Sequence, residues 1–196
     1  SKMAKFNLGI LKNIGFIKAK EKYSEKSHYI LSDVDLLPSN ELLEDYLRYP
    51  ESGAGGGPIH LGNKGTRYLG NSDSFLGGVL SVNYDDFIKS NGYPNDFWGW
   101  GGEDDALKKR FDINNIKIQR PKGSVIDLEE LSLDEKLSDL KQNESKEYLK
   151  REKLTRDKEW WNTNGLNSLD ELYKIISEEQ YGGSKNISHY KVYLKA

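Results

Sequence analysis

Two acidic motifs in the sequence contain residue types that can do chemistry. The first is Asp33-Val34-Asp35. Carboxylates are hard oxygen ligands that suit Mg²⁺ or Mn²⁺, and such an ion can bridge the phosphates of a bound nucleotide. The same tripeptide is also found in exposed turns whose acids are simply solvated. Taken alone, the motif leaves a metal site and an exposed turn as alternatives.

The second motif places two tryptophans, Trp98 and Trp100, before an acidic triplet, Glu103-Asp104-Asp105. An indole face offers a flat apolar area of the kind that the C–H face of a sugar also presents. Adjacent carboxylates raise one another's pKa, which suits a general base. The alternative is a helix with an acidic first turn, favoured by the helix dipole, beside tryptophans that belong to the core.

A third segment, at residues 75–79, combines an aromatic residue with two consecutive glycines. It begins with Phe75 and contains Gly77 and Gly78. Paired glycines indicate either a bulged strand or a backbone that approaches a ligand closely. The residues alone do not decide between these two interpretations.

The N-terminal quarter of the chain predicts the elements that would carry the first motif. Apolar residues recur at helical spacing over residues 6–24, where Asn7 can act as the N-cap. The apolar run at residues 28–31 predicts a buried strand that ends just before the two aspartates. Ligand sites in α/β sheets lie beyond the carboxyl ends of strands. A short helix is then expected from Ser39 to about Arg48.

The middle of the chain alternates loops with short apolar runs. We expect strands at residues 59–61, 67–69, 77–82 and 116–119. Helices are expected at residues 84–91, with Asn83 as the cap, and at 103–111. The glycine-rich stretches at 52–58 and 93–102 must be loops, so the second motif enters its helix from a loop.

The C-terminal third is more polar. Residues 127–161 are highly charged with a thin apolar stripe, which predicts one or two surface helices. A capping box at residues 168–171 predicts a helix to about Glu178. Alternation over residues 188–194 predicts a half-exposed strand. Together these helices and strands predict an α/β or α+β fold, in a single domain over residues 1–196.

Composition excludes several classes of protein. The formal net charge is −2, which argues against a strongly basic nucleic-acid binder. The chain has no cysteine, so disulfides, Cys-ligated zinc and thiol nucleophiles are excluded. No apolar run approaches the roughly 20 residues that a membrane-spanning helix needs. The three histidines are scattered, and we expect structural roles for them.

The order of the motifs carries a family resemblance. Ser32-Asp33-Val34-Asp35-Leu36-Leu37-Pro38 is followed by the segment at 75–79 and by Phe97-Trp98-Gly99-Trp100-Gly101-Gly102-Glu103-Asp104-Asp105. Further matching residues lie at 6–7, 13–16, 91–95, 120–121 and 165–169. This pattern resembles the β-1,4-galactosyltransferase family, glycosyltransferase family 7. The match is strongest over residues 6–121, the family-like catalytic region, and resumes at 165–169, within the C-terminal segment 165–196.

The resemblance implies an α/β fold of the GT-A type, with a mixed sheet flanked by helices, and it also implies a reaction. It implies inverting transfer of a galactose-like hexose from a UDP-sugar to a carbohydrate acceptor, with Mn²⁺ or Mg²⁺ as cofactor. By position, Asp35 corresponds to the metal-binding aspartate, and Asp33 lies beside it near the nucleotide. Asp104 corresponds to the general base for the acceptor hydroxyl, with Glu103 as its catalytic neighbour.

The remaining site residues follow from the same resemblance. Asp105 matches an acid that helps to hold sugars, and Trp100 matches the tryptophan that closes over donor and acceptor. Trp98, Gly77 and Gly78 are expected to line the same site. Phe75 falls where the galactosyl enzymes of the family carry a tyrosine that helps to select the donor, so the donor sugar stays open.

Two departures from the family pattern give a second hypothesis. The family's nucleotide-binding half, with its Pro-Phe-Arg-Asn-Arg stretch, precedes the point at which this chain starts, so we expect much of the uridine pocket to be missing. The alternatives are a fragment of a longer protein, a natural half that needs a partner chain, and a reduced enzyme. The Met-x-x-His metal pair is also missing. Its counterpart falls near residues 131–134, where Asp127, Glu129, Glu130 or Asp134 could substitute. The alternative function is a sugar-binding module that is catalytically incomplete.

The expected location also departs from the animal members of the family. Those proteins work in the Golgi lumen behind a membrane anchor and usually carry disulfides. The sequence contains no signal segment, membrane segment or cysteine. On these features we expect a cytoplasmic setting.

Overall fold

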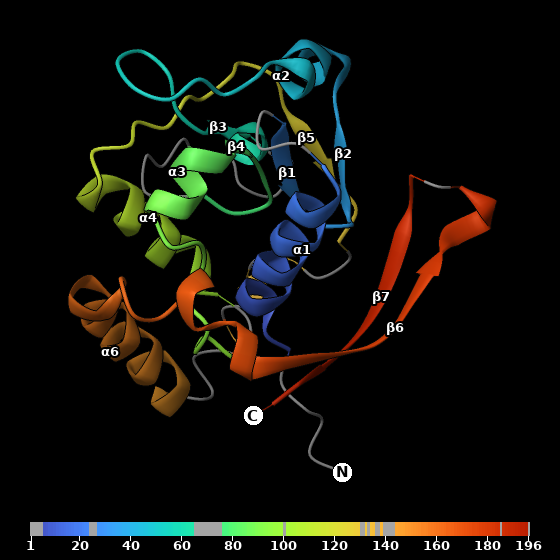
Figure 1. Ribbon diagram of the computed structural model, residues 1–196. Helices are drawn as coiled ribbons and strands as arrows, with labels where there is room; N and C mark the ends of the chain where they lie inside the picture. Colours follow the sequence, from blue (N-terminus) through green and yellow to red (C-terminus); the bar gives the residue numbers. More distant parts are fainter. Residues whose placement is uncertain are drawn as a thin grey trace.

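The computed structural model describes most of the chain (Figure 1). The described residues are 6–23, 27–64, 76–99, 101–129, 132, 134–135, 138, 144–184 and 186–195. The expected strand at 67–69 and two expected site residues, Phe75 and Trp100, lie outside them. Within the described part, no helix combines the length and apolarity needed to cross a membrane.

Helix α1, Leu8–Lys22, begins where the sequence predicts it. The Asn7 side chain accepts a hydrogen bond from the Ile10 amide at 2.9 Å, which satisfies one of the free N–H groups of the first turn. Ile10, Ile14 and Phe16 are buried. The apolar side of α1 therefore fixes the helix against the body of the protein.

Three short strands form the central sheet. Strand β1 is His28–Ser32, β3 is Ile59–His60 and β4 is Val79–Asn83, and their order is β1-β4-β3 with antiparallel pairing. All five residues of β4 are buried, because this strand lies in the middle. The described strands thus form small antiparallel sheets rather than one mixed sheet, although helices and strands intermix as predicted.

A second small sheet places the first acidic motif. Strand β2, Leu36–Pro38, pairs antiparallel with β5, Val125–Asp127. Residues 33–35 therefore form the turn between the central sheet and the second sheet. The sequence did not predict β2, because the strand is only three residues long and ends in a proline.

The helices surround these sheets. They are α2 at Leu43–Leu47, α3 at Tyr84–Lys89, α4 at Glu103–Ile113 and α6 at Glu144–Trp160. Short 3₁₀ turns lie at Asn40–Leu42, Leu61–Asn63, Leu166–Ser168, Asp170–Leu172 and Tyr181–Gly183. Asn83 caps α3 by accepting from the Asp86 amide at 2.7 Å, as predicted. Helices α4 and α6 pack against each other.

An aromatic core joins α1, the central sheet and α3. The ring of Phe16 lies 4.6 Å, centroid to centroid, from both Tyr29 and Phe87. Phe111 of α4 belongs to the same cluster and is fully buried. Because this cluster joins four elements, the positions of α1 and α4 relative to the sheet depend on it.

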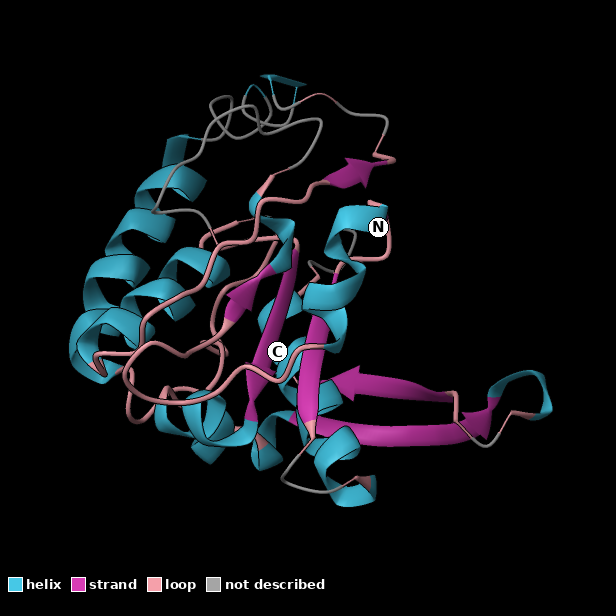
Figure 2. Cartoon of the chain, turned by 90° about the horizontal axis from the view of Figure 1, so that it is seen from above, coloured by secondary structure: helices cyan, strands magenta, loops and turns pink. Residues whose placement is uncertain are grey.

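Two expectations from the sequence are wrong. No α-helix forms over residues 168–178; the 3₁₀ turn at Asp170–Leu172 leads directly into β6, Tyr173–Gln180, which pairs with β7, Ser188–Leu194, in an antiparallel hairpin. Tyr173 and Ile175 alternate with exposed residues and pack with Val192 of β7 against α1. Cross-strand pairing therefore outweighs the capping box. Figures 1 and 2 show the hairpin projecting from the body on the side away from α6.

The second wrong expectation is the strand at 116–119. Its backbone runs alongside Ile59 but forms only an isolated parallel bridge between Ile59 and Gln119. The Gln119 amide donates to the Pro58 carbonyl at 2.8 Å, and the His60 amide donates to the Gln119 carbonyl at 2.9 Å. Two such bonds hold the segment in place without extending the pairing into a ladder.

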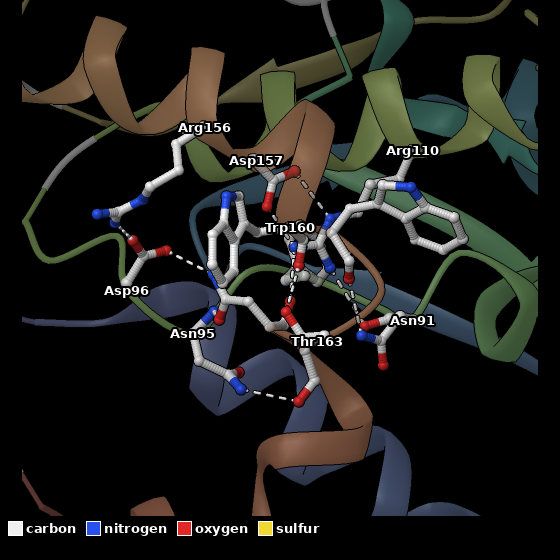
Figure 3. A network of polar contacts seen from close by, with 12 residues as sticks. Asn91, Asn95, Asp96, Arg110, Arg156, Asp157, Trp160 and Thr163 are labelled. Atoms are coloured by element: carbon white, nitrogen blue, oxygen red, sulfur yellow. Dashed lines mark hydrogen bonds and ion pairs between the residues drawn. The ribbon is translucent and has the colours of Figure 1, made fainter.

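A buried ion pair connects α4 with α6 (Figure 3). The Arg110 side chain has no exposed surface, and it donates from Nε to Asp157 Oδ2 at 3.0 Å and from a terminal nitrogen to Oδ1 at 2.5 Å. Its remaining donors reach the carbonyls of Asn91, Gly92 and Asn164. A buried pair of this kind is stable only when its charges and donors are satisfied together.

We expect Asp157→Ala to lower the free energy of unfolding by about 3–5 kcal/mol, because the substitution leaves the Arg110 charge buried without its partner. Urea unfolding measures this loss. The matched control is Asp112→Ala, which removes an ion pair to Lys108 whose aspartate is half exposed and should cost less than about 1 kcal/mol. Equal losses in the two variants would contradict the assignment.

Candidate active site

The loop that leads into the acidic triplet is fastened to α1 by asparagine side chains. Asn13 donates to the Tyr93 carbonyl at 2.8 Å and accepts from the Tyr93 amide at 2.9 Å. The Asn7 side chain donates to the Asn95 carbonyl at 2.9 Å, and Asn95 in turn donates to the Gly165 carbonyl at 2.7 Å. Because these contacts are buried, the loop has a fixed path.

The same loop is held from its other side by α6 and the segment that follows it (Figure 3). Asp96 accepts from Arg156 at 2.7 Å and from Asn164 at 2.8 Å. The loop ends at Gly102, whose φ is +97°, and a Cβ added at this position would come within 2.7 Å of the Phe97 ring. Only glycine fits both the backbone conformation and the space, so this residue sets where α4 begins.

The charges of two first-turn acids of α4, Glu103 and Asp104, interact with the charge of a buried lysine. The ammonium of Lys12, on α1, lies 2.9 Å from Asp33 Oδ1, and its side chain is 7 % exposed. The charges of Asp33, Glu103 and Lys12 all act on Asp104. We call Lys12, Asp33, Glu103 and Asp104 the acidic cluster. It joins the β1–β2 turn to the start of α4.

The two acids of α4 in the acidic cluster both have raised pKa values. Burial, followed by the charge of Glu103, raises the pKa of Asp104 to about 7. Burial also raises the pKa of Glu103. Asp104 Oδ1 and Glu103 Oε2 are both buried and find no hydrogen-bond partner among the described residues. Two such acceptors are expected to gain donors from a ligand.

Lys12 is a site residue that the sequence motifs do not reveal. Burial by itself lowers its pKa, but Tyr93, Asp104 and Asp33 outweigh burial and hold the pKa above its usual value. Its Nζ also lies 5.6 Å from the centre of the Tyr93 ring. One feature of the sequence could have indicated it. Lys12 is a charged residue four positions after Leu8 and four before Phe16, so it falls on an apolar face of the helix.

The second of the paired glycines contacts the backbone of Asp33. The Asp33 amide donates to the Gly78 carbonyl at 3.0 Å. Gly78 has φ +86°, and a Cβ there would meet the Leu36 side chain at 2.8 Å. The Gly77 carbonyl lies 2.8 Å from the buried Nε2 of His60. The glycines therefore set the backbone of the acidic turn.

His60 is the histidine with a defined role in this support. Burial lowers its pKa to about 4, so the ring is neutral at pH 7. A neutral ring can donate from Nε2 to the Gly77 carbonyl while Nδ1 accepts from Arg120 at 2.6 Å. This arrangement agrees with the structural role expected for His60.

Three further expected site residues, Asp105, Trp98 and Asp35, are not members of the acidic cluster as defined above. Asp105 is exposed on α4. Trp98 is half-buried and packs against the apolar cluster of Ile10, Ile14 and Leu169, so at least part of its indole belongs to the core. The Asp35 carbonyl accepts from the Leu128 amide at 2.8 Å, which places this residue beside β5.

The described residues show one candidate metal ligand rather than a complete metal site. Within them, no group of three or more His, Cys, Asp or Glu side chains surrounds a common point. Asp35 is half-buried and offers hard carboxylate oxygens, which fit Mn²⁺ or Mg²⁺. Of the substitutes expected for the missing pair, Glu130 lies outside the described residues, and Asp127 accepts from the Glu129 amide at 2.9 Å.

Comparison with known sequences relates this chain to galactosyltransferases. A family model described as the N-terminal domain of galactosyltransferase matches residues 57–132. Human β-1,4-galactosyltransferase 4 is 33 % identical over 192 residues, covering 89 % of this chain and 47 % of the human protein. Bovine β-1,4-galactosyltransferase 3 is 33 % identical over 177 residues, covering 89 % and 41 %. The chain thus spans about half the length of these relatives or less.

Comparison with solved structures extends the match to nearly the whole chain. The catalytic domain of Drosophila β-1,4-galactosyltransferase 7, in complex with xylobiose, superposes with a TM-score of 0.68 at 26 % identity, covering 98 % of this chain and 76 % of that one. A mutant of the same enzyme in complex with manganese, UDP-Gal and xylobiose gives a TM-score of 0.67 at 25 % identity, covering 99 % and 77 %. The chain belongs to the β-1,4-galactosyltransferase family, glycosyltransferase family 7, and is homologous to its catalytic domain.

Proposed function

We propose that this chain is a metal-dependent, inverting glycosyltransferase that moves a galactose-like hexose from a UDP-sugar to a hydroxyl of a carbohydrate acceptor. The observation that carries the proposal is the state of Asp104. Its Oδ1 is buried without a partner among the described residues, and its pKa is raised to about 7. A carboxylate with that pKa accepts a proton near neutral pH far better than a solvated one does.

The proposed reaction is a single displacement. Asp104 takes the proton of the acceptor hydroxyl while the hydroxyl oxygen forms a bond to the anomeric carbon of the donor. The bond between that carbon and the diphosphate oxygen breaks, and its electron pair leaves with UDP. Attack from the face opposite the leaving group inverts the anomeric centre, and no covalent enzyme intermediate is needed.

The neighbours of Asp104 would bind and orient the sugars. The buried and unpartnered Glu103 Oε2 can accept a hydrogen bond from a sugar hydroxyl. Asp33 is held by its amide and by Lys12, so its second carboxylate oxygen can face a ligand. The other residues proposed to bind donor or acceptor are Phe75, Gly77, Gly78, Trp98, Trp100 and Asp105.

The donor side of the proposal rests on Asp35. This carboxylate would supply one oxygen ligand to Mn²⁺ or Mg²⁺, beside the β5 strand. When bound, such an ion acts as a Lewis acid toward the leaving diphosphate. The crystallised Drosophila homologue contains manganese and UDP-Gal, and this supports the choice of metal and donor class for the present chain.

We expect Asp104→Asn to abolish sugar transfer and to leave UDP binding nearly unchanged, because the amide cannot accept the proton. The kcat/KM of the unmodified chain should rise with pH through about 7, as Asp104 loses its proton. Both effects can be measured by assaying galactose transfer from UDP-galactose to xylobiose and quantifying the product by chromatography. Asp112→Asn, at the far end of α4, is the matched control. Turnover that survives Asp104→Asn would exclude this residue as the base.

We expect UDP to bind this chain only when Mn²⁺ or Mg²⁺ is present, and Asp35→Asn to remove that dependence together with the binding. Isothermal titration calorimetry measures the affinity, with Asp45→Asn on α2 as the control. If the folded chain binds sugars but never UDP, the alternative function, a sugar-binding module that needs a partner or an upstream region, is the better description.

A further inference from the structure

The proposed reaction does not explain why the charged side chain of Lys12 is buried. It lies on the buried side of α1, with its ammonium against Asp33 and near the Tyr93 ring, and its charge also interacts with that of Asp104. Burying an ammonium costs several kcal/mol unless neighbouring charges offset the lost hydration. A methionine or leucine would fill the same space without that cost. Packing alone therefore does not account for a lysine here.

The charges around Lys12 identify what the ammonium does. Tyr93 has its pKa raised by burial and is uncharged at neutral pH, so Asp33, Asp104 and Glu103 are the groups that balance the ammonium near pH 7. These three carboxylates come from two segments, the β1–β2 turn and the start of α4. Without a cation between them, mutual repulsion would drive the segments apart or protonate one of the acids.

We propose that Lys12 is a positioning residue that holds Asp33 in the acidic cluster and keeps a substantial fraction of Asp104 ionised at neutral pH, so that Asp104 can take the acceptor's proton. This inference rests on the proposed function, since it assigns Lys12 a role through the base.

The groups that face Asp104 come from every element around it. Glu103 and Asp105 lie on α4 itself, Asp33 on the β1–β2 turn, Tyr93 on the loop before α4 and Lys12 on α1. Burial and the three acids favour the protonated form of Asp104, whereas the charge of Lys12 favours the carboxylate. From α6, Lys150 acts on Glu103 and lowers its pKa. Lys12 therefore lowers the pKa of Asp104, whereas burial and the neighbouring acids raise it.

The test is the pH profile of transfer by Lys12→Met. We expect the acid limb of kcat/KM to move to higher pH by at least one unit, which corresponds to about a fivefold loss at pH 7, and activity to recover toward pH 9. Lys12→Arg should keep the limb near its original position because it keeps the charge. Lys18→Met, on the same helix but paired with Glu21, should change nothing.

A purely structural role for Lys12 predicts a different result. Activity would then fall by the same factor at every pH, and alkaline pH would not restore it, which would overturn the inference. Lys12→Gln provides the same comparison if the methionine variant does not fold, because glutamine keeps a hydrogen-bond donor without the charge. A limb that stays in place in Lys12→Gln would likewise overturn it.

A direct titration separates this inference from the proposed function. Carboxyl ¹³C NMR can follow Asp104, with its signal assigned by its loss in Asp104→Asn. We expect Lys12→Met to raise the titration midpoint of that signal. If the unmodified chain transfers no sugar but the midpoint moves, the proposed function fails and the effect of Lys12 on Asp104 stands. If transfer occurs and the midpoint does not move, the inference about Lys12 fails alone.

Discussion

The burial of the Arg110 guanidinium is the constraint on which the geometry of the site depends. Its donors reach Asp157 on α6, two carbonyls of the loop before α4, and one carbonyl after α6. A charged group without exposed surface tolerates no loss of these partners, so the segments keep one arrangement. Because α4 carries Arg110 near one end and Asp104 near the other, the same contacts that hold α6 in place also aim the first turn of α4 at α1.

The fixed arrangement of these segments compensates for an unfavourable contribution that the acidic cluster makes to the free energy of unfolding. An unfolded chain ionises Asp104 near its ordinary pKa of 3.8, whereas the folded chain does so only near 7. Between these values the folded state binds a proton that the unfolded state has lost, and above them the ionised carboxylate lowers the free energy of unfolding. The left-handed backbone at Gly78 and Gly102 belongs to the same site. Unfavourable charge and backbone conformations that favour glycine are thus concentrated at the proposed ligand site.

Local signals in the sequence predicted the elements that depend on local physics. The Asn7 and Asn83 caps, strand β1 and the acidic start of α4 follow from side-chain chemistry within a few residues. The β6 strand did not, since Leu172, Ile175 and Ile176 fit helical spacing as well as alternation, and only pairing with β7 decides between them. Lys12 was missed for a similar reason: its partners, Asp33 and Asp104, are distant in sequence, and a single lysine on a helix face carries no motif.

The projecting hairpin has a consequence for the behaviour of this protein in concentrated solution. Within the described residues, β6 and β7 pair only with each other, so the outer edge of each strand presents open N–H and C=O groups to which another chain could add a strand. Exposed charges lie along both strands, with Lys174 and Glu179 on β6 and Lys191 on β7, and a β-bulge between Ile175 and Ser177 interrupts the register. Charge and irregular register are the means by which exposed strands avoid edge-to-edge aggregation, and this hairpin has both.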